Sequence, residues 1–409
     1  MARADRLRPD YSLTADLSVP FLQSTPEQTI WQRAKTRLVY GAPHFTLLSG
    51  DAGMHIARQV GEILQHTVPD NPPAFSNNEV RALVPKDVAT RDVYVIQSTN
   101  GNPDASLTQL KLIEEGAKGA GANRITAVVT HLPYSRQDRR EQPGAPEAAR
   151  LSAREIMRAG SHDPEKRRHE SRLTASANLI LVDIHSEKPL LPLTEHNGLE
   201  WANLDSFHVL APKIQQLIAS RQLTPTIAFP DKGAAKRYET YAEAFGGGME
   251  NAAIIQKERD ISKNNSVTIS SNQEDLSGKV AGTDVFLIDD IIDTAGSILQ
   301  AAQRLKQEGA KSVWVVATHG IFSKDALQKM NDDAIDGCVI TDTIPPREDV
   351  LDHPKIEVVS IAPLIATAIQ RIEKRQPIAD LTKSMSPGFE HSYMRLSRRI
   401  NRQRLRRHD

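Results

Sequence analysis

Three aspartates and a turn of small residues follow an apolar run in VFLIDDIIDTAGSI, residues 285–298. In open parallel sheets, ligands bind beyond the carboxyl ends of the strands, where helices begin. Free N–H groups of residues 294–297 suit a phosphate, and Asp289 and Asp290 suit sugar hydroxyls or a hydrated cation. The pattern predicts a pocket for a phosphorylated sugar. The alternative, a charged turn with one capping residue, explains one acid but not two adjacent acids followed by Asp293.

A second polar cluster, HLPYSRQDRR (131–140), follows another apolar run. Two cations, an amide and a carboxylate beyond a strand suit a nucleoside triphosphate, and Arg136 is favoured for the phosphates. Taken alone, the same residues could form a salt-bridge cluster on the surface. The cluster therefore predicts a nucleotide site only in combination with the rest of the chain.

Eight apolar runs supply the strands that must position these residues. They do not alternate with polar residues, so both faces of each strand should be covered, as in a parallel sheet. Helical periodicity fills the gaps between the runs, which indicates an α/β fold. We predict two similar domains, each a mostly parallel sheet flanked by helices. The runs are 44–50, 92–99, 125–132, 178–185, 225–231, 284–290, 312–320 and 337–343.

The predicted organisation has an N-terminal extension (1–43), an N-terminal domain (44–200), a C-terminal domain (201–362) and a final helix with a basic tail (363–409). Residues 141–175 expand the N-terminal domain with a helix-like patch and then a charge-dense run, which we expect to be a solvated loop. Seven of the last fifteen residues are arginines. That tail could bind phosphate or RNA, although a solvated or assembly-facing helix is the favoured interpretation.

Composition limits the class of protein. The chain has 409 residues, and its 51 basic residues balance its 51 acidic residues, so no overall charge favours nucleic acid or a membrane. The single cysteine, Cys338, excludes an internal disulfide and lies in an apolar run, which predicts a buried inert thiol. No run is long enough to span a membrane, and the N-terminus lacks the apolar core of a secretory signal. A cytoplasmic enzyme or binding protein is expected.

The loop at 285–298 resembles the phosphoribosyl-diphosphate loop that type I phosphoribosyltransferases share with ribose-phosphate pyrophosphokinases. Further segments distinguish the two families, because PYSRQDR resembles the PYARQDR signature of the pyrophosphokinases. Similar segments occur in family order from about residue 44 to residue 373. The chain therefore looks like a ribose-phosphate pyrophosphokinase with a type I phosphoribosyltransferase-like fold. The other matching segments are VDIHSEKP (182–189), FPDKG (229–233), ATHGIFS (317–323) and TDTIP (341–345).

The resemblance implies transfer of the diphosphoryl group of ATP to the 1-hydroxyl of ribose 5-phosphate, giving phosphoribosyl diphosphate and AMP for nucleotide biosynthesis. It implies an N-terminal domain that binds ATP and a C-terminal domain that binds ribose phosphate. One alternative is a non-catalytic regulatory relative of the enzyme. A phosphoribosyltransferase is a weaker alternative, because it has no use for PYSRQDRR. Nucleic acid is an unlikely partner, since only the arginine-rich tail favours it.

The same resemblance assigns the ribose-phosphate and metal residues. Asp289 and Asp290 would hold the ribose hydroxyls directly or through a metal, and Asp293 would shape the loop. Mg²⁺ on ATP would be positioned by His185 and Asp231, although a histidine at a strand end is more often structural and Mg²⁺ prefers oxygen. The backbone that would bind the 5-phosphate belongs to Thr294, Ala295, Gly296 and Ser297.

ATP and the transferred group are assigned by resemblance as well. Arg136, Gln137 and Asp138 would contact ATP. The family carries a lysine and an arginine on a flexible catalytic loop, and Lys257 and Arg259 occupy those places here, with Glu258 in place of a middle cation. Without its context, K-E-R would be an ordinary exposed charge run. Retention of the flanking pair favours activity.

The adenine pocket of the family comes from a neighbouring subunit. FSNNE loosely matches that segment, so Phe75 would stack on adenine and Glu79 would accept a hydrogen bond from its amino group, with Asn77 replacing the usual aspartate. A buried phenylalanine is the alternative. If the role holds, the enzyme is a homo-oligomer, at least a dimer. SEKPLL (186–191) departs from the family pattern, which makes inhibition by ADP and the assembly state open questions.

Overall fold

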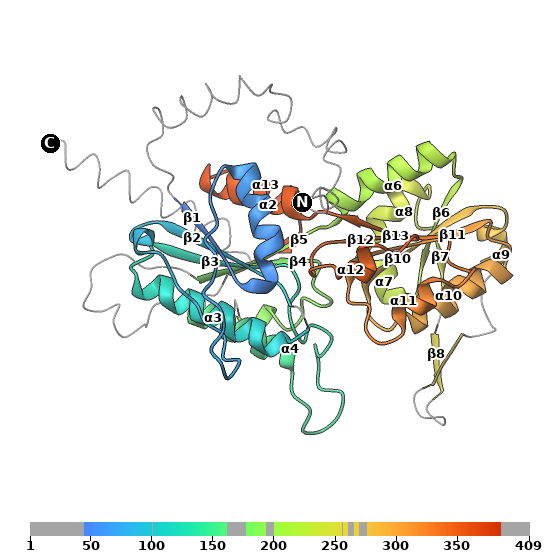
Figure 1. Cartoon of the computed structure of the whole chain (residues 1–409). Helices are drawn as coiled ribbons and strands as arrows, with labels where there is room; N and C mark the ends of the chain where they lie inside the picture. Colours follow the sequence, from blue (N-terminus) through green and yellow to red (C-terminus); the bar gives the residue numbers. More distant parts are fainter. Residues whose placement is uncertain are drawn as a thin grey trace, which may run out of the picture. The chain divides into compact units, whose positions relative to one another are not determined.

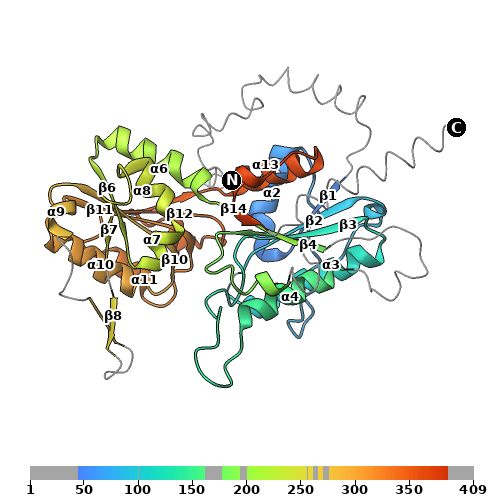
Figure 2. The same ribbon diagram turned by 180° about the vertical axis from the view of Figure 1, so that it is seen from behind.

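The computed structural model describes residues 45–99, 101–161, 177–193, 200–255, 257–260, 266–269 and 276–385. The described chain forms two compact units. The first unit contains the described residues up to Asp205 and those from Ala362 onward, and the second contains Ser206–Ile361. Each unit has one six-stranded sheet with helices on both faces (Figures 1 and 2). The predicted α/β fold with two similar parallel-sheet domains is confirmed.

The sheet of the first unit is parallel except at one edge. Its first five strands pair in parallel, and β14 pairs antiparallel with β5. β5 and β14 lack long apolar runs, so the sequence did not predict them. The strands, in order across the sheet, are β1 (Phe45–Ser49), β2 (Asp92–Gln97), β3 (Arg124–Val129), β4 (Ala177–Val182), β5 (Glu200–Leu204) and β14 (Thr382–Met385).

Helices α2 and α13 cover one face of this sheet, and α3 and α4 cover the other (Figures 1 and 2). α3 begins sharply because Asn102 accepts a hydrogen bond from the N–H of Ala105, and Pro103 supplies the first helical residue. The helical spacing of Leu364, Ile365, Ala368, Ile369 and Ile372 predicts one apolar face for the last helix, and all five residues are buried. The helices are α2 (Met54–Leu64), α3 (Pro103–Gly119), α4 (Ala148–Ala159) and α13 (Ala362–Glu373), with 3-10 turns η3 (Asp51–Gly53), η4 (Lys86–Val88) and η6 (Ala379–Leu381).

The C-terminal end of α13 is tied to the sheet of the first unit by a nearly buried charge group. Arg124 at the start of β3 pairs with Asp92 and lies 3.2 Å from Glu373, which also accepts a hydrogen bond from the Tyr94 hydroxyl at 2.7 Å. Burial raises the pKa of Glu373, although the charge of Arg124 opposes this shift. These contacts place α13 in the first unit. The expected domain boundaries near 200 and 362 stay predictions.

The sheet of the second unit is parallel throughout. β6 and β7 extend to one side, whereas the later strands extend to the other, so the strand order reverses between β6 and β10. Open α/β sheets bind ligands at such a switch point, beyond the carboxyl ends of the strands. The order is β13 (Ile356–Val359), β12 (Gly337–Thr341), β11 (Ser312–Gly320), β10 (Asp284–Ile292), β6 (Pro225–Phe229) and β7 (Ala253–Ile254).

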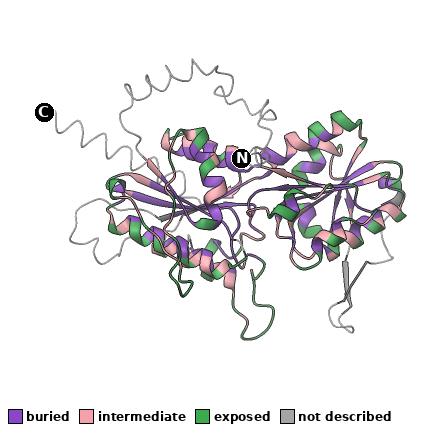
Figure 3. Cartoon of the chain, in the orientation of Figure 1, coloured by how far each residue is buried: buried purple, intermediate pink, exposed green. Residues whose placement is uncertain are grey.

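Helices α6 and α8 lie on one face of the second sheet, and α10 and α11 lie on the other (Figure 1). The strands are buried while the outer faces of the helices are exposed (Figure 3). Cys338 is buried as predicted, and burial raises the pKa of its thiol. The helices are α6 (Phe207–Arg221), α7 (Lys232–Arg237), α8 (Glu239–Phe245), α9 (Leu276–Val280), α10 (Gly296–Gln307), α11 (Ala326–Met330) and α12 (Glu348–Leu351).

A two-stranded hairpin occupies part of the stretch expected to be a flexible loop. β8 (Lys257–Asp260) and β9 (Ser266–Ile269) pair antiparallel, with Lys257 opposite Ile269 and Arg259 opposite Val267. The expectation of a loop is wrong for these eight residues, because Ser-Val-Thr-Ile is rich in the β-branched residues that favour strands. Within the described residues, no helix has the length and apolar character needed to cross a membrane.

Candidate functional site

Two of the predicted ribose-binding acids lie at the carboxyl end of β10. The strand continues through Ile292, two residues beyond the predicted end. Successive strand residues point to opposite faces, so the side chains of Asp289 and Asp290 leave opposite faces of β10. Asp290 is buried and Asp289 is half-buried, and the N–H of Asp290 donates to the Asp289 carboxylate at 2.9 Å. Both acids lie at the switch point between β6 and β10.

Asp231 lies at the other side of this switch point, directly after β6. Its carboxylate caps α7 by accepting a hydrogen bond from the N–H of Ala234 at 2.9 Å. Capping leaves further lone pairs on the carboxylate for another ligand. Asp231 and the β10 acids therefore come from the ends of two adjacent parallel strands.

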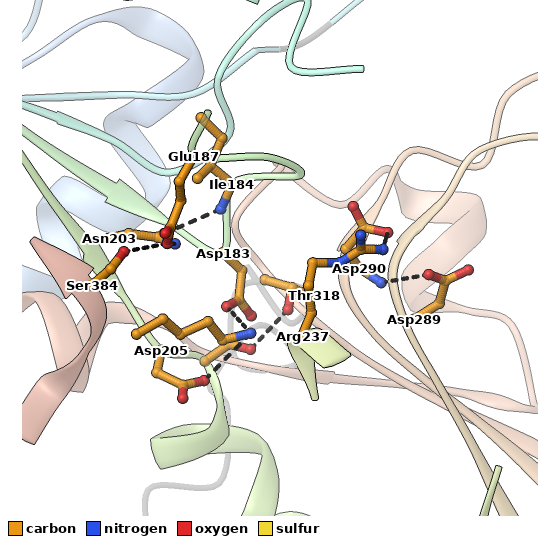
Figure 4. Close-up of polar contacts among 12 residues, drawn as sticks. Asp183, Ile184, Glu187, Asn203, Asp205, Arg237, Asp289, Asp290, Thr318 and Ser384 are labelled. Atoms are coloured by element: carbon orange, nitrogen blue, oxygen red, sulfur yellow. Dashed lines mark hydrogen bonds and ion pairs between the residues drawn. The ribbon is translucent and has the colours of Figure 1, made fainter. Parts of the chain in front are cut away.

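Arg237 at the end of α7 was missed by the sequence analysis, and it joins these acids. Its guanidinium Nη2 lies 3.5 Å from Asp290 Oδ1 (Figure 4). Burial by itself would lower the pKa of Arg237, but the surrounding negative charges, with Asp290 the largest, raise it overall. Asp289 and Asp231 contribute to the same shift. In the described chain, no atom accepts a hydrogen bond from the buried Arg237 Nε. Arg237 thus pairs with Asp290 and lies within electrostatic range of Asp289 and Asp231.

The turn after β10 is held by the chain that follows β11. The Ser323 hydroxyl donates to the Asp293 carboxylate, and the Ser323 N–H donates to the Asp293 carbonyl at 2.9 Å. Lys329 Nζ donates to the Thr294 carbonyl at 3.0 Å. Asp293 therefore shapes the turn, as the resemblance implies, while Lys329 is a contact that no sequence signal indicated.

The turn ends in a left-handed residue before α10. Ala295 has φ +55°, an uncommon conformation for a residue with a side chain. Gly296 and Ser297 then form the first turn of the twelve-residue helix α10. The first N–H groups of a helix have no partner within it and favour an anion. This geometry is compatible with phosphate binding by the backbone from Thr294 to Ser297, which stays a prediction.

The predicted Mg²⁺ residues, His185 and Asp231, differ in how well their donor atoms suit the ion. Within the described residues, no three His, Cys, Asp or Glu side chains form a group that could hold a metal ion alone. Mg²⁺ is commonly held by one or two carboxylates together with substrate phosphates and water. Asp231 fits that pattern. His185, half-buried in the first unit, fits less well because Mg²⁺ prefers oxygen.

The loop after β3 carries the expected ATP residues. Tyr134 has φ +63° and its hydroxyl donates to Asp104 in the first turn of α3. That contact raises the pKa of Tyr134. The turn leaves Arg136 and Gln137 exposed and Asp138 half-buried. The three side chains are accessible to a ligand, and their roles in ATP binding stay predictions.

The predicted adenine residues form a compact turn in the long connection between α2 and β2. The Phe75 N–H donates to the Glu79 carbonyl at 2.9 Å, and Asn77 Oδ1 accepts from the Glu79 N–H at 3.2 Å. The Phe75 ring is 53% exposed, with the Arg81 guanidinium 4.6 Å from its centroid. The alternative of a buried phenylalanine is wrong.

This turn is anchored at both ends, through Asp51 of η3 and Gln109 of α3. Asn71 donates to Asp51 at 3.0 Å, before the turn. After the turn, Gln109 Nε2 donates to the Arg81 carbonyl at 3.2 Å and to Asp51 Oδ2 at 2.8 Å. The exposed aromatic ring therefore lies on a held scaffold. The sequence analysis missed this network because its members are up to 58 residues apart.

Two mostly parallel sheets, each flanked by helices, place the chain in the class of α/β proteins with two similar domains. Comparison with known proteins specifies the class further. The N-terminal domain of ribose phosphate pyrophosphokinase matches residues 45–160. The phosphoribosyl synthetase-associated domain matches residues 236–383.

Individual relatives match over most of their length. The ribose-phosphate pyrophosphokinase of Helicobacter hepaticus is 30% identical over 338 residues, which cover 82% of this chain and 98% of the relative. That of Aquifex aeolicus is 32% identical over 307 residues, 75% of this chain and 88% of the relative. The crystal structure of phosphoribosylpyrophosphate synthetase from Mycobacterium smegmatis has a TM-score of 0.67 and 27% identity, covering 81% of this chain and 99% of that one.

The chain belongs to the ribose-phosphate pyrophosphokinase family and is an enzyme of that class. The family predicted from the motifs is confirmed. The individual site residues stay predictions, and the side chains of Lys257 and Arg259 lie outside the described part of the structure.

Proposed function

We propose that the enzyme transfers the diphosphoryl group of ATP to the 1-hydroxyl of ribose 5-phosphate, giving phosphoribosyl diphosphate and AMP. One observation carries the proposal. At the switch point of the second sheet, the chain brings together Asp231, Asp289, Asp290 and Arg237. The backbone turn from Thr294 to Ser297, which opens α10, follows shortly after these acids of β10. The second unit therefore contains both the carboxylates that would bind the sugar hydroxyls and the backbone N–H groups that would bind the phosphate.

Ribose 5-phosphate binding follows from this arrangement. The N–H groups from Thr294 to Ser297 receive the 5-phosphate at the start of α10. The ribose hydroxyls donate to the carboxylates of Asp289 and Asp290. Lys329 fixes the turn through the Thr294 carbonyl. Each contact orients the sugar, and orientation supplies much of the catalysis in phosphoryl transfer.

ATP is held by the first unit in this proposal. Arg136 pairs with a phosphate of ATP. Gln137 donates or accepts hydrogen bonds to the nucleotide through its amide, and the Asp138 carboxylate accepts them. Phe75 stacks on adenine beside Asn77 and Glu79, from a neighbouring copy of the chain, so the working enzyme is a homo-oligomer. Asp231 would hold Mg²⁺ and His185 would help to place it, as the resemblance implies, and the ion would supply neutralisation of phosphate charge.

The transfer itself is an attack on the β-phosphorus. The 1-hydroxyl oxygen of ribose forms a bond to that phosphorus, the bond to the oxygen of the α-phosphate breaks, AMP leaves, and the hydroxyl proton is released. Lys257 and Arg259 stabilise the negative charge that moves with the diphosphoryl group. Glu258 between them reduces the net positive charge.

The test is AMP release from ATP by the purified full chain with ribose 5-phosphate and Mg²⁺. We expect release that requires both substrates and stops when EDTA removes the metal. Lys257→Ala should lower kcat by about 100-fold or more, the usual effect of removing one charge-stabilising group. Lys86→Ala, which removes an exposed lysine of η4, is the matched control and should keep full activity.

Two outcomes would contradict the proposal. AMP release that is unaffected by Lys257→Ala would remove the catalytic assignment of the β8 lysine. No AMP release at any concentration of inorganic phosphate would leave the regulatory interpretation instead. AMP release without ribose 5-phosphate would indicate hydrolysis of ATP and a different acceptor.

A further inference from the structure

The loop that follows β4, Asp183–Glu187, is held by side chains of β14, a strand nearly 200 residues later in the chain. We propose that Lys383 and Ser384 of β14 form a clamp that sets the conformation of this loop. In this proposal Lys383 is a positioning residue for His185. The inference rests on the proposed function, because the role of His185 toward the metal-bound nucleotide is part of that function.

The loop leaves β4 through a strained residue. Asp183 has φ +43°, a conformation that L residues keep only where the surroundings enforce it. β5 supplies the backbone part of that enforcement. The Asp183 N–H donates to the Leu204 carbonyl, and the Ile184 N–H donates to Asn203 Oδ1, each at 3.1 Å. This bend fixes the direction in which the chain reaches His185.

Charge supplies the other part of the enforcement. The Asp183 side chain is 0% exposed, and Lys383 Nζ lies 2.6 Å from its Oδ1. The same ammonium lies 3.8 Å from Asp205 Oδ1. A buried carboxylate that loses its cation must bind a proton or turn toward water. Either change would release the bend at Asp183.

The far end of the loop is tied to the same two strands. The Ser384 hydroxyl and the Asn203 amide both donate to Glu187 Oε1, the latter at 2.7 Å (Figure 4). The Glu187 carbonyl accepts from the Leu190 N–H at 2.9 Å. His185 is therefore the middle residue of a five-residue loop that is fastened at both ends.

An irregularity in β14 directs Lys383 toward this loop. Thr382 pairs with Leu204, whereas Ser384 pairs with Asn203, so Lys383 is an extra residue in the strand. Such a β-bulge turns a side chain away from the position it would have in a regular strand. The residue added by this bulge is the one whose ammonium pairs with Asp183.

The experiment uses the full chain with Lys383→Met, which keeps most of the length of the side chain and removes its charge. Amide hydrogen exchange reads the loop directly, and we expect the Ile184 N–H to exchange at least about tenfold faster. The KM for ATP with Mg²⁺ should rise about tenfold, the size typical for residues that orient a metal ligand. The kcat at saturating ATP should change less than about threefold, since no reacting group is touched.

Two further variants separate positioning from general stability. Arg371→Met is the matched control, because it removes an exposed ion pair with Asp380 from the same C-terminal segment and should leave KM unchanged. His185→Ala combined with Lys383→Met should have the same KM as His185→Ala alone, because Lys383 acts through His185. A double variant whose two effects multiply would overturn the positioning role.

Each remaining outcome decides between the clamp and the proposed function. Unchanged exchange at Ile184 and unchanged KM in Lys383→Met would refute the clamp and leave the function standing. If that variant does not fold, Ser384→Ala, which keeps the ion pair, should still speed exchange near Glu187, and its failure to do so would refute the clamp. Absence of AMP release from the unaltered chain would refute the function, while hydrogen exchange would still test the clamp.

Discussion

At the residue scale, the charge balance around Arg237 decides how the acid group of the second unit behaves. The side chain of Asp290 is only 4% exposed and pairs with Arg237. Buried charges are tolerated when they are paired, and removal of one partner leaves the other uncompensated. The arginine therefore offsets the negative charge of the carboxylates that lie near it.

This balance leads to a prediction for Arg237→Gln. Loss of the cation should lower the free energy of unfolding of the Mg²⁺-free protein by about 2 kcal/mol, a value reduced from that of a fully buried pair because Arg237 is partly exposed. Millimolar Mg²⁺ should then raise the Tm of the variant more than that of the unaltered protein, because it replaces the missing positive charge.

The matched control for that prediction is Arg221→Gln. Arg221 is the last residue of α6, and its guanidinium carbon lies 4.6 Å from the centre of the Trp314 ring, away from the acid group. Its variant should show the same response to Mg²⁺ as the unaltered protein. If Mg²⁺ raised the Tm of Arg237→Gln only as much as that of the unaltered protein, the charge of the acids would not be balanced by Arg237.

At the scale of elements, one buried acid ties three strands of the second sheet at their starts. Asp284, the first residue of β10, accepts hydrogen bonds from the Thr224 N–H at 2.8 Å and the Ser312 hydroxyl at 2.6 Å. These partners directly precede β6 and open β11. The hydrogen bonds of Asp284 thus fix β6, β10 and β11 relative to one another. The positions of Asp231, Asp289 and Asp290, at the carboxyl ends of β6 and β10, depend on that alignment.

Asp284 also makes the stability of this sheet depend on pH. Burial by itself would raise its pKa, but the hydrogen bonds from Ser312 and Thr224 and the charge of Lys311 lower it below the ordinary value of 3.8. A carboxyl with a lowered pKa stabilises the folded state above its unfolded pKa, and this contribution is lost as the pH falls through the folded pKa.

We therefore expect Asp284→Asn to lower the free energy of unfolding by about 2 kcal/mol at pH 7, the usual value for hydrogen bonds to a charged group. The difference from the unaltered protein should narrow below pH 4, as measured by urea unfolding at each pH. Asp333→Asn, at an exposed position of the same unit, should differ little at either pH. A constant difference across the pH range would exclude the charge as its cause.

At the scale of the whole molecule, the exposed Phe75 turn is the feature that a single copy of the chain leaves unexplained. Its ring is half-exposed on a scaffold that Asp51 and Gln109 hold in place. Exposed aromatic side chains on ordered turns are typical anchors of interfaces. We expect the turn to act on the nucleotide of a neighbouring copy.

A mixing experiment tests that expectation. Phe75→Ala should raise the KM for ATP about tenfold, because a stacked base contributes roughly 1–3 kcal/mol. Phe75→Ala and Lys257→Ala protomers, mixed and allowed to exchange, should release more AMP than the two samples separately. Leu351→Ala, a similarly exposed apolar residue of α12, is the control. No gain on mixing would show that the turn serves its own chain.

The sequence by itself determined eight of the strands and the order of the motifs, because both depend on local patterns. The eight apolar runs became eight strands, and the acids of VFLIDDIID lie at a strand end as expected. Periodicity also predicted the buried stripe of α13. The family followed from these local segments, since their residue types and order were enough to recognise it.

Only the tertiary structure decided which distant residues serve the sites. Arg237 lies 53 residues before Asp290, Lys329 lies 35 residues after Thr294, and Ser384 lies 197 residues after Glu187. None of these pairs has a local signature. The bulge at Lys383 and the reversal of strand order between β6 and β10 likewise depend on pairing between separate strands. Contacts of this kind arise when the chain folds, so they cannot be read from spacing along it.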